Sequence, residues 1–337
     1  MGITIESDPD PETWNDLVER SGQTCPFHQY ESLRIQADHS NGTVHPLVGY
    51  KGEEPIGLFP VFELSRGPVQ LAFSPPPALR IAYLGPALLE NNGLKQRKRE
   101  RRLHDFVEKS LEWAESAFNP RYGHMRLHGS FEDLRPFIWN DCTVRPSYTY
   151  LVDLDTDEDD LLMSFSRDAR SNIRDNEDGL KSVREGEIGD LQPIVEQVAA
   201  RYARQGIEFA ITPDFVETLA TELPDGVVRP YVLEADGSFL GGVVVLDDGT
   251  TVYRWQGGVR TDSDTDIPIN DLLDWQIMAD AIDRGRTGYD LVGADNRRIN
   301  RYKAKFNPDL ESFYSIEQGS SITTALARGY RWLQRRT

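Results

Sequence analysis

The chain has 337 residues, of which 55 are acidic and 37 basic, and its formal net charge is −18. This length is sufficient for two domains of ordinary size. The two cysteines, Cys25 and Cys142, argue against a disulfide-stabilised scaffold. No apolar run approaches the roughly 18 residues of a membrane-spanning helix, and the N-terminus lacks the regions of a secretion signal, so we expect a cytoplasmic protein.

The basic residues are mostly arginine, because only seven of the 37 are lysines. A surface rich in acid and poor in lysine suits a cytoplasm of molar salt, where the Debye length is only about 3 Å and acidic repulsion is screened. We therefore expect a salt-loving, archaeal source; the alternative is an acidic protein from an ordinary habitat. The same charge should destabilise the folded chain at low salt.

Apolar periodicity and turn residues predict two helices, two strands, a long helix and a third strand in the first half: 14–20, 29–38, 43–50, 56–64, 94–118 and 122–128. The acidic stretch 153–160 then indicates a solvated linker that enters a helix. The second half predicts a helix, a hairpin, a long helix, a short strand and a basic-aromatic segment: 161–174, 231–246 with 251–257, 270–284, 289–292 and 302–306.

The two halves share a plan. Both 49–62 and 233–246 contain a strand, a polar turn with glycine, and a second strand that opens on a glycine. A long helix and another strand follow in each half. This weak internal similarity predicts a duplicated unit of mixed α/β (α+β) type, in which mixed sheets are flanked by helices. We place the domains at 1–154 and 155–337.

An arginine-rich stretch opens the second half. On the predicted helix, Arg167, Arg170 and Arg174 fall at i, i+3 and i+7 and form a cationic stripe close to Asn172. Such a stripe suits phosphate, carboxylate or a nucleotide tail, so these four residues are candidate substrate-binding residues. The alternative is that the arginines pair with nearby acids such as Asp175.

Two of the seven lysines, Lys303 and Lys305, fall in one five-residue segment. If this segment is extended, both lysines share a face and could stabilise a developing oxyanion or hold a phosphate. The segment follows a predicted strand, and ligands of α/β sheets gather at the carboxyl ends of strands. At the same edge, Asp295 is a candidate general base and Asn296 could orient an amine. The alternative for the lysines is a salt-bridged surface turn.

The strongest basic cluster of this acidic chain lies at 95–102, where the long helix of the first half begins. It could contact RNA phosphates or an anionic membrane surface, although a charge run on a helix is usually a solvated face. Motifs for metal binding or for an activated serine are absent from the sequence, and all six histidines lie at or before His128. We therefore expect no metal site and no tightly bound cofactor.

Three segments of the second half resemble a known family. The stretch 161–180 is similar to its arginine- and asparagine-containing helix, 270–285 with 289–293 to its helix–strand unit, and 301–307 to its basic-aromatic segment. The family is the Fem-type (FemAB-like) branch of the GNAT acyltransferase superfamily. The resemblance is clear over 158–316 and weaker in the first half, at 26–30 and 56–60.

The resemblance implies two tandem GNAT-like domains, with a last helix at 321–336 that packs back on the first domain in some relatives. It also implies transfer of an acyl or aminoacyl group to an amine. The donor would be acyl-CoA, another acyl thioester or aminoacyl-tRNA, used as a co-substrate. The acceptor would be an amine on a small molecule, a peptide or a glycolipid.

The resemblance also implies roles for particular residues. Lys305 or Lys303 would stabilise the carbonyl oxygen, and Asp295 or a water molecule would take the proton. Four further residues are candidates for substrate binding in the second domain: Trp255, Asn270, Tyr302 and Phe306. The sequence names no residues that bind a cofactor and no oligomeric state.

The sequence departs from the family in the loop 260–268. This loop lacks the glycines with which GNAT enzymes hold a pyrophosphate and carries three acids, so we do not expect a CoA tail to bind there in the usual way. There is also no long coiled-coil insertion of the kind found in some tRNA-using relatives. The rival interpretation is a non-catalytic protein that binds RNA or an anionic glycolipid through 95–102.

Overall fold

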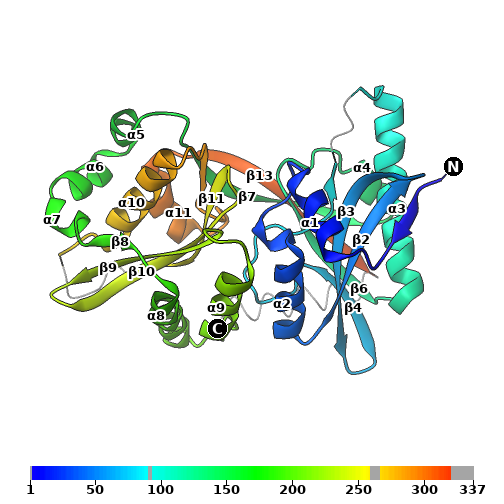
Figure 1. Ribbon diagram of the computed structural model, residues 1–337, viewed down its shortest axis with the longest axis horizontal. Coiled ribbons are helices and arrows are strands. Elements are labelled where there is room, and N and C mark those ends of the chain that lie inside the picture. Colours follow the sequence, from blue (N-terminus) through cyan, green and yellow to red (C-terminus); the bar gives the residue numbers. More distant parts are fainter. Residues whose placement is uncertain (1, 90–92, 259–265, 320–337) are drawn as a thin grey trace. The chain divides into compact units, whose positions relative to one another are not determined.

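The computed structural model describes residues 2–89, 93–258 and 266–319 (Figure 1). The chain forms two compact units, one of Met1–Ser147 with the residues from Ser312 onward, and one of Tyr148–Glu311. The first unit therefore gives way to the second after Ser147, seven residues before the boundary at 154 that the sequence predicted. Most of the last described strand belongs to the first unit. The predicted helix 321–336 and most of the loop 260–268 lie outside the described residues.

The first unit is built on a mixed sheet with the strand order β1-β2-β3-β4-β6-β13. Neighbouring strands are antiparallel except β4 and β6, which run parallel. A two-residue strand, β5, pairs with β3. The strands are β1 Thr4–Glu6, β2 Thr43–Lys51, β3 Glu54–Arg66, β4 Val69–Ser74, β5 Ala87–Leu88, β6 Tyr122–Leu127 and β13 Asp309–Gly319.

Helices cover both faces of this sheet, with α1 and α2 on one side and α3 on the other (Figure 1). Phe106 of α3 packs so closely on the sheet that a Cβ atom at Gly49 would lie 2.4 Å from its ring, and one at Gly57 would lie 2.8 Å away. These two glycines therefore allow the long helix to lie on β2 and β3. The helical elements are α1 Pro11–Glu19, η1 Pro26–His28, α2 Tyr30–Ser40, α3 Gln96–Phe118 and α4 Arg135–Trp139.

The second unit is built on a sheet with the order β7-β12-β11-β10-β9-β8, in which only β11 and β12 run parallel. The turn between β9 and β10 has positive φ at both Asp236 and Gly237, as a tight type I′ hairpin requires. The strands are β7 Thr143–Asp153, β8 Val183–Glu185, β9 Val228–Ala235, β10 Ser238–Asp247, β11 Thr251–Gly257 and β12 Gly288–Asp290.

In this unit α10 lies on one side of the sheet, and α8 and α9 lie on the other (Figure 1). Its core combines Val243 and Val245 of β10 with Leu272, Ile277 and Met278 of α10. The helical elements are α5 Glu158–Ser164, α6 Arg167–Arg174, α7 Glu177–Leu180, η2 Ile188–Asp190, α8 Leu191–Ala203, α9 Pro213–Glu222, α10 Ile269–Asp283, α11 Arg297–Lys303 and η3 Ala304–Phe306.

The duplicated plan predicted from the sequence is confirmed. In the first unit, β2, β3 and β4 form an antiparallel meander, α3 follows, and β6 returns parallel to β4. In the second unit, β9, β10 and β11 form the meander, α10 follows, and β12 returns parallel to β11. The mixed α/β fold class is likewise confirmed.

One local prediction is wrong, and one condition that the sequence analysis set is not met. The helix expected over 161–174 is two helices, because Phe165 is extended and Ser166 caps α6 by accepting a hydrogen bond from the Ala169 amide. The segment 302–306 is not extended but helical, at the end of α11 and in η3. Lys303 and Lys305 therefore do not share a face.

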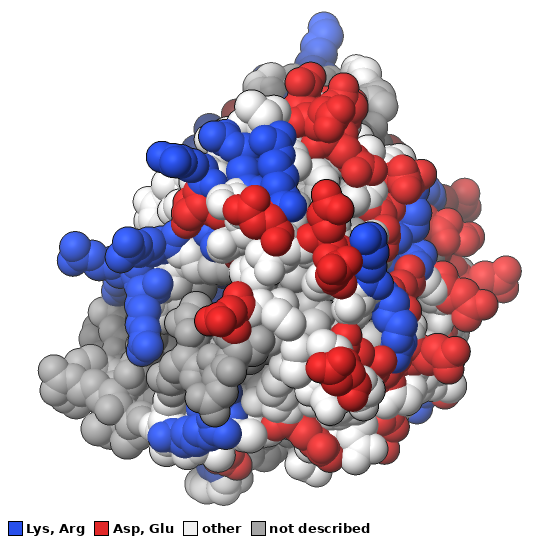
Figure 2. Space-filling view, turned by 90° about the vertical axis from the view of Figure 1, so that its left-hand side faces the viewer, with Lys and Arg blue, Asp and Glu red and all other residues white. Residues whose placement is uncertain are grey.

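Charge is distributed unevenly over the end of the molecule that carries α5, α6 and α7. Figure 2 shows this end, with acidic side chains mostly on its right and many basic ones toward its left. α5 contributes acidic residues to the second unit, since its first turn contains Glu158, Asp159 and Asp160. None of the helices in the described residues is long and apolar enough to cross a membrane.

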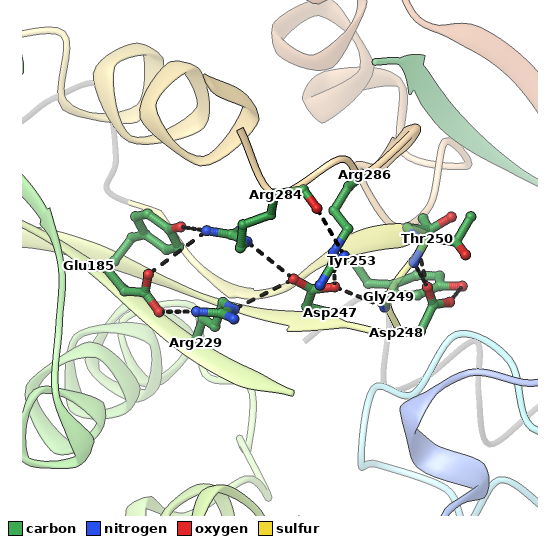
Figure 3. A network of polar contacts seen from close by, with 11 residues as sticks. Glu185, Arg229, Asp247, Asp248, Gly249, Thr250, Tyr253, Arg284 and Arg286 are labelled. Carbon is green, nitrogen blue, oxygen red and sulfur yellow. Dashed lines mark hydrogen bonds and ion pairs between the residues drawn. The ribbon is translucent and has the colours of Figure 1, made fainter. Parts of the chain in front are cut away.

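A network of charges joins three elements of the second unit (Figure 3). The buried carboxylate of Asp247, at the end of β10, contacts the Nε atoms of Arg286, Arg284 and Arg229 at 2.8, 3.4 and 3.5 Å. Glu185 of β8 accepts a 2.5 Å hydrogen bond from Arg229. This network ties the ends of β8, β9 and β10 to the residues that follow α10.

Candidate active site

The candidate site is built around two buried carboxylates on α10. Asp271 and Asp274 are three residues apart, so they lie on one side of the helix, and their exposed fractions are 3% and 0%. Asp271 stands in the first turn, where the helix dipole favours a negative charge. Buried carboxylates require partners, and other elements of the second unit supply them.

Asp274 accepts hydrogen bonds from three side chains. Arg254 of β11 donates through Nε at 2.6 Å, and the Tyr289 hydroxyl of β12 donates at 2.6 Å. The hydroxyl of Tyr302 on α11 is the third donor. Burial, and then the charge of Asp274, hold the pKa of both phenols well above the ordinary value, so the tyrosines remain protonated donors. Asp274 thereby fixes α10, β11, β12 and α11 to one another.

Asp271 binds Lys305 and Asn172. The Lys305 ammonium donates to the carboxylate at 2.6 Å, and the Asn172 amide donates to the same oxygen. The Lys305 nitrogen also lies 4.8 Å from the ring centre of Tyr302 and 5.9 Å from that of Phe306. Burial raises the pKa of Asp271, and the bonds from Lys305 and Asn172 oppose this rise.

Lys303 has a different environment. Its ammonium donates to the carbonyls of Val292 at 2.9 Å and Gly293 at 2.6 Å, in the loop after β12. Val292 has φ of 53°, a left-handed conformation that a branched residue adopts only when its surroundings hold it. Burial, and then the charge of Arg254, lower the pKa of Lys303 to about 8. Lys303 therefore stabilises a strained loop from within.

The same loop is fixed from its other side. Asp290 accepts a 2.7 Å hydrogen bond from the Val292 amide and a 2.5 Å bond from the Thr149 hydroxyl. The Thr149 oxygen in turn accepts a 2.9 Å bond from the Gly293 amide. The carboxyl end of β12 is thus rigid, which suits a position where a reacting group must be held.

The structure brings four of the predicted residues together, because Asn172, Tyr302, Lys305 and Phe306 all lie around Asp271 or next to its lysine. The α6 backbone completes this arrangement, since the Ser166 amide donates to the Lys305 carbonyl at 2.8 Å. Phe306 is fully buried and packs edge-on against Phe165 at 5.2 Å. The basic-aromatic segment therefore joins α6 to α10.

The three arginines of the predicted stripe differ in their contacts. Arg170 donates to the carbonyls of Met163 and Phe165, and Arg174 contacts the Met163 sulfur at 3.3 Å. Arg167 and Arg174 are exposed, and within the described part of the chain none of the three forms an ion pair with an acid. The expected alternative, pairing with neighbours such as Asp175, is therefore not what the structure shows.

The remaining predicted residues are not among the hydrogen-bond donors described above for the two carboxylates. Asp295 is exposed, and Asn296 caps α11 by accepting a 3.0 Å bond from the Arg298 amide. Trp255 is buried, with its ring 6.2 Å from that of Phe215. Asn270 is half-buried at the start of α10.

Sequence reasoning missed the residues that organise this site. Asp271, Asp274, Arg254 and Tyr289 belong to elements that it predicted, but it gave them no role. The available signal was the pair of aspartates three apart on a helix that is otherwise mostly apolar over Ile269–Met278. A polar pair on the apolar side of a helix requires buried partners.

One group of possible metal ligands occurs in the part of the chain that is described. His104, Asp105 and Glu108 of α3 place ligand atoms within 4.8 Å of one another, and all three are partly exposed. They belong to the first unit, not to the α10 site. Neighbouring acids on an exposed helix occur commonly without an ion, so this group assigns no metal.

Comparison with known proteins relates the α10 site to a family. Residues 164–304 match the family described as an acetyltransferase (GNAT) domain. This range contains both carboxylates and every partner described above except Lys305, which follows it directly. No curated protein sequence matches the chain.

Solved structures extend the comparison to nearly the whole chain. The structure of FemX has a TM-score of 0.71 at 13% identity and covers 93% of this chain and 97% of that one. The L-PGS of Bacillus licheniformis has a TM-score of 0.55 at 12% identity, covering 98% of each chain. The C-terminal domain (DUF2156) of a protein described as a lysylphosphatidylglycerol synthetase, from Agrobacterium fabrum, has a TM-score of 0.56 at 16% identity, covering 94% and 93%. Residues 164–304 are therefore similar to an acetyltransferase (GNAT) domain, and the chain as a whole has a fold similar to that of FemX.

Proposed function

We propose that the chain is an N-acyltransferase that moves an acyl or aminoacyl group from an activated donor to an amine. The observation that carries this proposal is the Lys305–Asp271 pair, held at 2.6 Å within the second unit. The family match over 164–304 supports the transferase class, because it contains Asp271 and ends one residue before Lys305. The chemical identities of the donor and of the acceptor are also proposed here.

Lys305 is the residue that we assign to the carbonyl oxygen. An ammonium has three N–H donors, and the bond to Asp271 uses one of them. The side chain of Lys305 is 14% exposed, so it is not fully closed off from solvent although Asp271 and two aromatic rings hold it. A preorganised donor of this kind stabilises the negative charge that develops on a carbonyl oxygen during attack.

The reaction then follows direct attack. The amine nitrogen forms a bond to the carbonyl carbon, and the oxygen gains negative charge that Lys305 stabilises. The bond from carbon to the sulfur of a thioester, or to the ester oxygen of an aminoacyl-tRNA, then breaks. The amine loses its proton to water or to Asp295, and the leaving group takes up a proton. Lys303 holds the loop after β12 and does not contact the reacting carbonyl in this scheme.

The proposed donors are an acyl thioester, such as acyl-CoA, and aminoacyl-tRNA; both are anionic. The exposed Arg167 and Arg174 on α6 are the groups that we assign to that charge. The proposed acceptor is an amine on a small molecule, a peptide or a glycolipid. One structure of similar fold carries a name that refers to lysylphosphatidylglycerol, which is an aminoacylated lipid, so aminoacyl donors belong in any screen.

The first test is donor binding, read as the melting temperature in molar KCl with acyl-CoAs, free CoA and aminoacyl-tRNAs. The identified donor is then used, labelled in its acyl group, to measure transfer to amines. We expect Lys305→Ala to lower kcat by about 10²- to 10³-fold, as the loss of one oxyanion donor does in other enzymes. The control is Lys181→Ala, which removes a lysine that is exposed on the same unit.

Lys305→Ala leaves Asp271 buried without its cation, so a loss of activity could reflect unfolding. The double variant Lys305→Ala with Asp271→Asn removes this charge. It should melt near the wild-type temperature and still lack activity. If either variant retains wild-type turnover, the assignment of Lys305 is wrong. If no donor supports transfer and binding of RNA or an anionic glycolipid depends only on 95–102, the non-catalytic alternative is correct.

A further inference from the structure

The first unit carries a basic surface that neither its fold nor acyl transfer explains. Five basic residues around the start of α3 are exposed, and none forms an ion pair within the described part of the chain: Lys95, Arg97, Lys98, Arg99 and Arg101. Arg102 differs, because it binds both oxygens of Glu54 at 2.8 Å. In a chain with a net charge of −18, five unpaired cations in seven residues require a reason.

The stability of the helix does not supply that reason. The N-terminus of a helix carries the positive end of its dipole, and cations there are unfavourable. α3 has no acidic residue in its first turn, so no carboxylate offsets the cations at that end of the helix. The placement opposes helix stability, which indicates that the cations serve contact with an anionic partner.

Exposed apolar side chains lie beside the cations. Ile138 and Trp139, on α4, are 56% and 59% exposed. α4 lies against this part of α3, because Arg135 pairs with Glu100 at 2.6 Å and the Trp139 ring meets His104 edge-on at 5.3 Å. An exposed tryptophan next to an exposed isoleucine is costly in water unless a partner covers it.

The helical repeat places the nearest cations on the same face. Arg97, Glu100, Arg101 and His104 follow at i, i+3, i+4 and i+7, so they share one side of α3, and Glu100 and His104 contact α4. Arg97 and Arg101 therefore flank the exposed pair. We call Arg97, Arg101, Ile138 and Trp139 the α3–α4 patch.

We propose that the α3–α4 patch docks the chain on an anionic phospholipid bilayer. Lipid phosphates would meet Arg97 and Arg101, since basic side chains near an anionic leaflet are attracted to it. Trp139 would lie at the level of the headgroups and Ile138 would enter the boundary of the acyl chains. A nucleic acid could use the arginines but would gain little from Ile138, so the composition of the patch favours lipid.

The test is sedimentation of the full chain with vesicles of phosphatidylcholine mixed with phosphatidylglycerol, compared with vesicles of phosphatidylcholine alone. We expect binding only to the anionic vesicles, and weaker binding as KCl rises because salt screens the arginines. Arg97→Glu with Arg101→Glu should weaken binding by about tenfold or more. Ile138→Ser with Trp139→Ser should weaken it at every salt concentration.

The matched control reverses two arginines elsewhere on the first unit. Arg20 and Arg66 are exposed, and Arg20→Glu with Arg66→Glu gives the same change of net charge. This control should bind vesicles as the wild type does, and melting temperatures verify that each variant is folded. Equal binding to both kinds of vesicle, no binding, or wild-type binding by the patch variants would overturn the proposal. So would capture of single-stranded RNA that needs the arginines but not Trp139.

Discussion

Lys303 and Lys305 are two residues apart, yet their surroundings give them different chemistry. Lys305 contacts a carboxylate and two aromatic rings. Lys303 contacts two carbonyls in a buried place, and burial, followed by the charge of Arg254, lowers its pKa to about 8. The sequence analysis could place both lysines on one face only on the condition that the segment is extended, and the segment is helical.

The lowered pKa of Lys303 predicts a pH-dependent stability. The folded-state pKa is about 8, below the ordinary 10.5 that applies when the chain is unfolded. Between these values the unfolded chain binds more protons, so the free energy of unfolding should rise with pH in that window, by up to about 1.4 kcal/mol per pH unit. Below about pH 8 both states are protonated, and Lys303 contributes no slope.

Urea unfolding of the wild type and Lys303→Met, from about pH 7 to about pH 10, measures this effect. The wild type should gain stability relative to Lys303→Met above about pH 8. Lys181→Met serves as the control, because its side chain is exposed and should give a curve parallel to the wild type. Parallel curves for Lys303→Met would show that this ammonium does not titrate in the folded protein.

At the scale of elements, the strands and helices with strong apolar periodicity were predicted well from the sequence. The strand expected at 43–50 is β2, the strand at 251–257 is β11, and the helix at 270–284 is α10, which covers Ile269–Asp283. The site was harder, because its partners are distant in sequence. Arg254 and Asp274 are 20 residues apart, and Asn172 and Asp271 are 99 apart. Local patterns show that an aspartate lies on a helix but not which distant donor meets it.

The network around Asp247 shows how elements depend on one charge (Figure 3). Three arginines approach this carboxylate, and Asp247 itself is 3% exposed. Asp247→Ala should leave Glu185 as the carboxylate that contacts Arg229 and Arg284 and should remove the ion pair of Arg286. We expect it to lower the free energy of unfolding by about 3 kcal/mol or more. Urea unfolding in molar KCl provides the measurement.

The control for this variant is Asp214→Ala, which removes an exposed acid from α9 and changes the net charge equally. Asp214→Ala should lower the free energy of unfolding by less than about 1 kcal/mol. Adding Arg284→Met to Asp247→Ala should restore part of the loss, because one unpaired cation is removed. A small effect of Asp247→Ala, similar to that of Asp214→Ala, would show that the arginines are satisfied by solvent.

At the scale of the whole molecule, each sheet is completed by a strand from outside its own repeat. β13, near the end of the described chain, pairs with β6 in the first unit. β7, which precedes the second repeat, pairs with β12 in the second unit. Such long-range pairings have no local signature in the sequence. The domain boundary was therefore predicted at 154, whereas the units divide after Ser147.

The net charge of −18 predicts that the stability of the whole molecule depends on salt. Acidic groups crowd around α5, where burial and then the charges of Asp283, Asp159 and Asp280 raise the pKa of Glu158. Repulsion of this kind opposes the compact state and is screened as the Debye length falls from about 10 Å at 0.1 M to about 3 Å at 1 M. The melting temperature should therefore rise with KCl over this range.

Two controls separate screening from general stabilisation. Sucrose strengthens burial by exclusion from the protein surface without screening charge, so it cannot replace KCl if repulsion is the cause. Asp159→Asn with Asp283→Asn removes two exposed acids beside Glu158 and should raise the melting temperature at low salt more than at high salt. If this variant and the wild type respond to KCl in the same way, the salt dependence does not come from repulsion at α5. A melting temperature that does not change with KCl would instead identify an acidic protein without adaptation to salt.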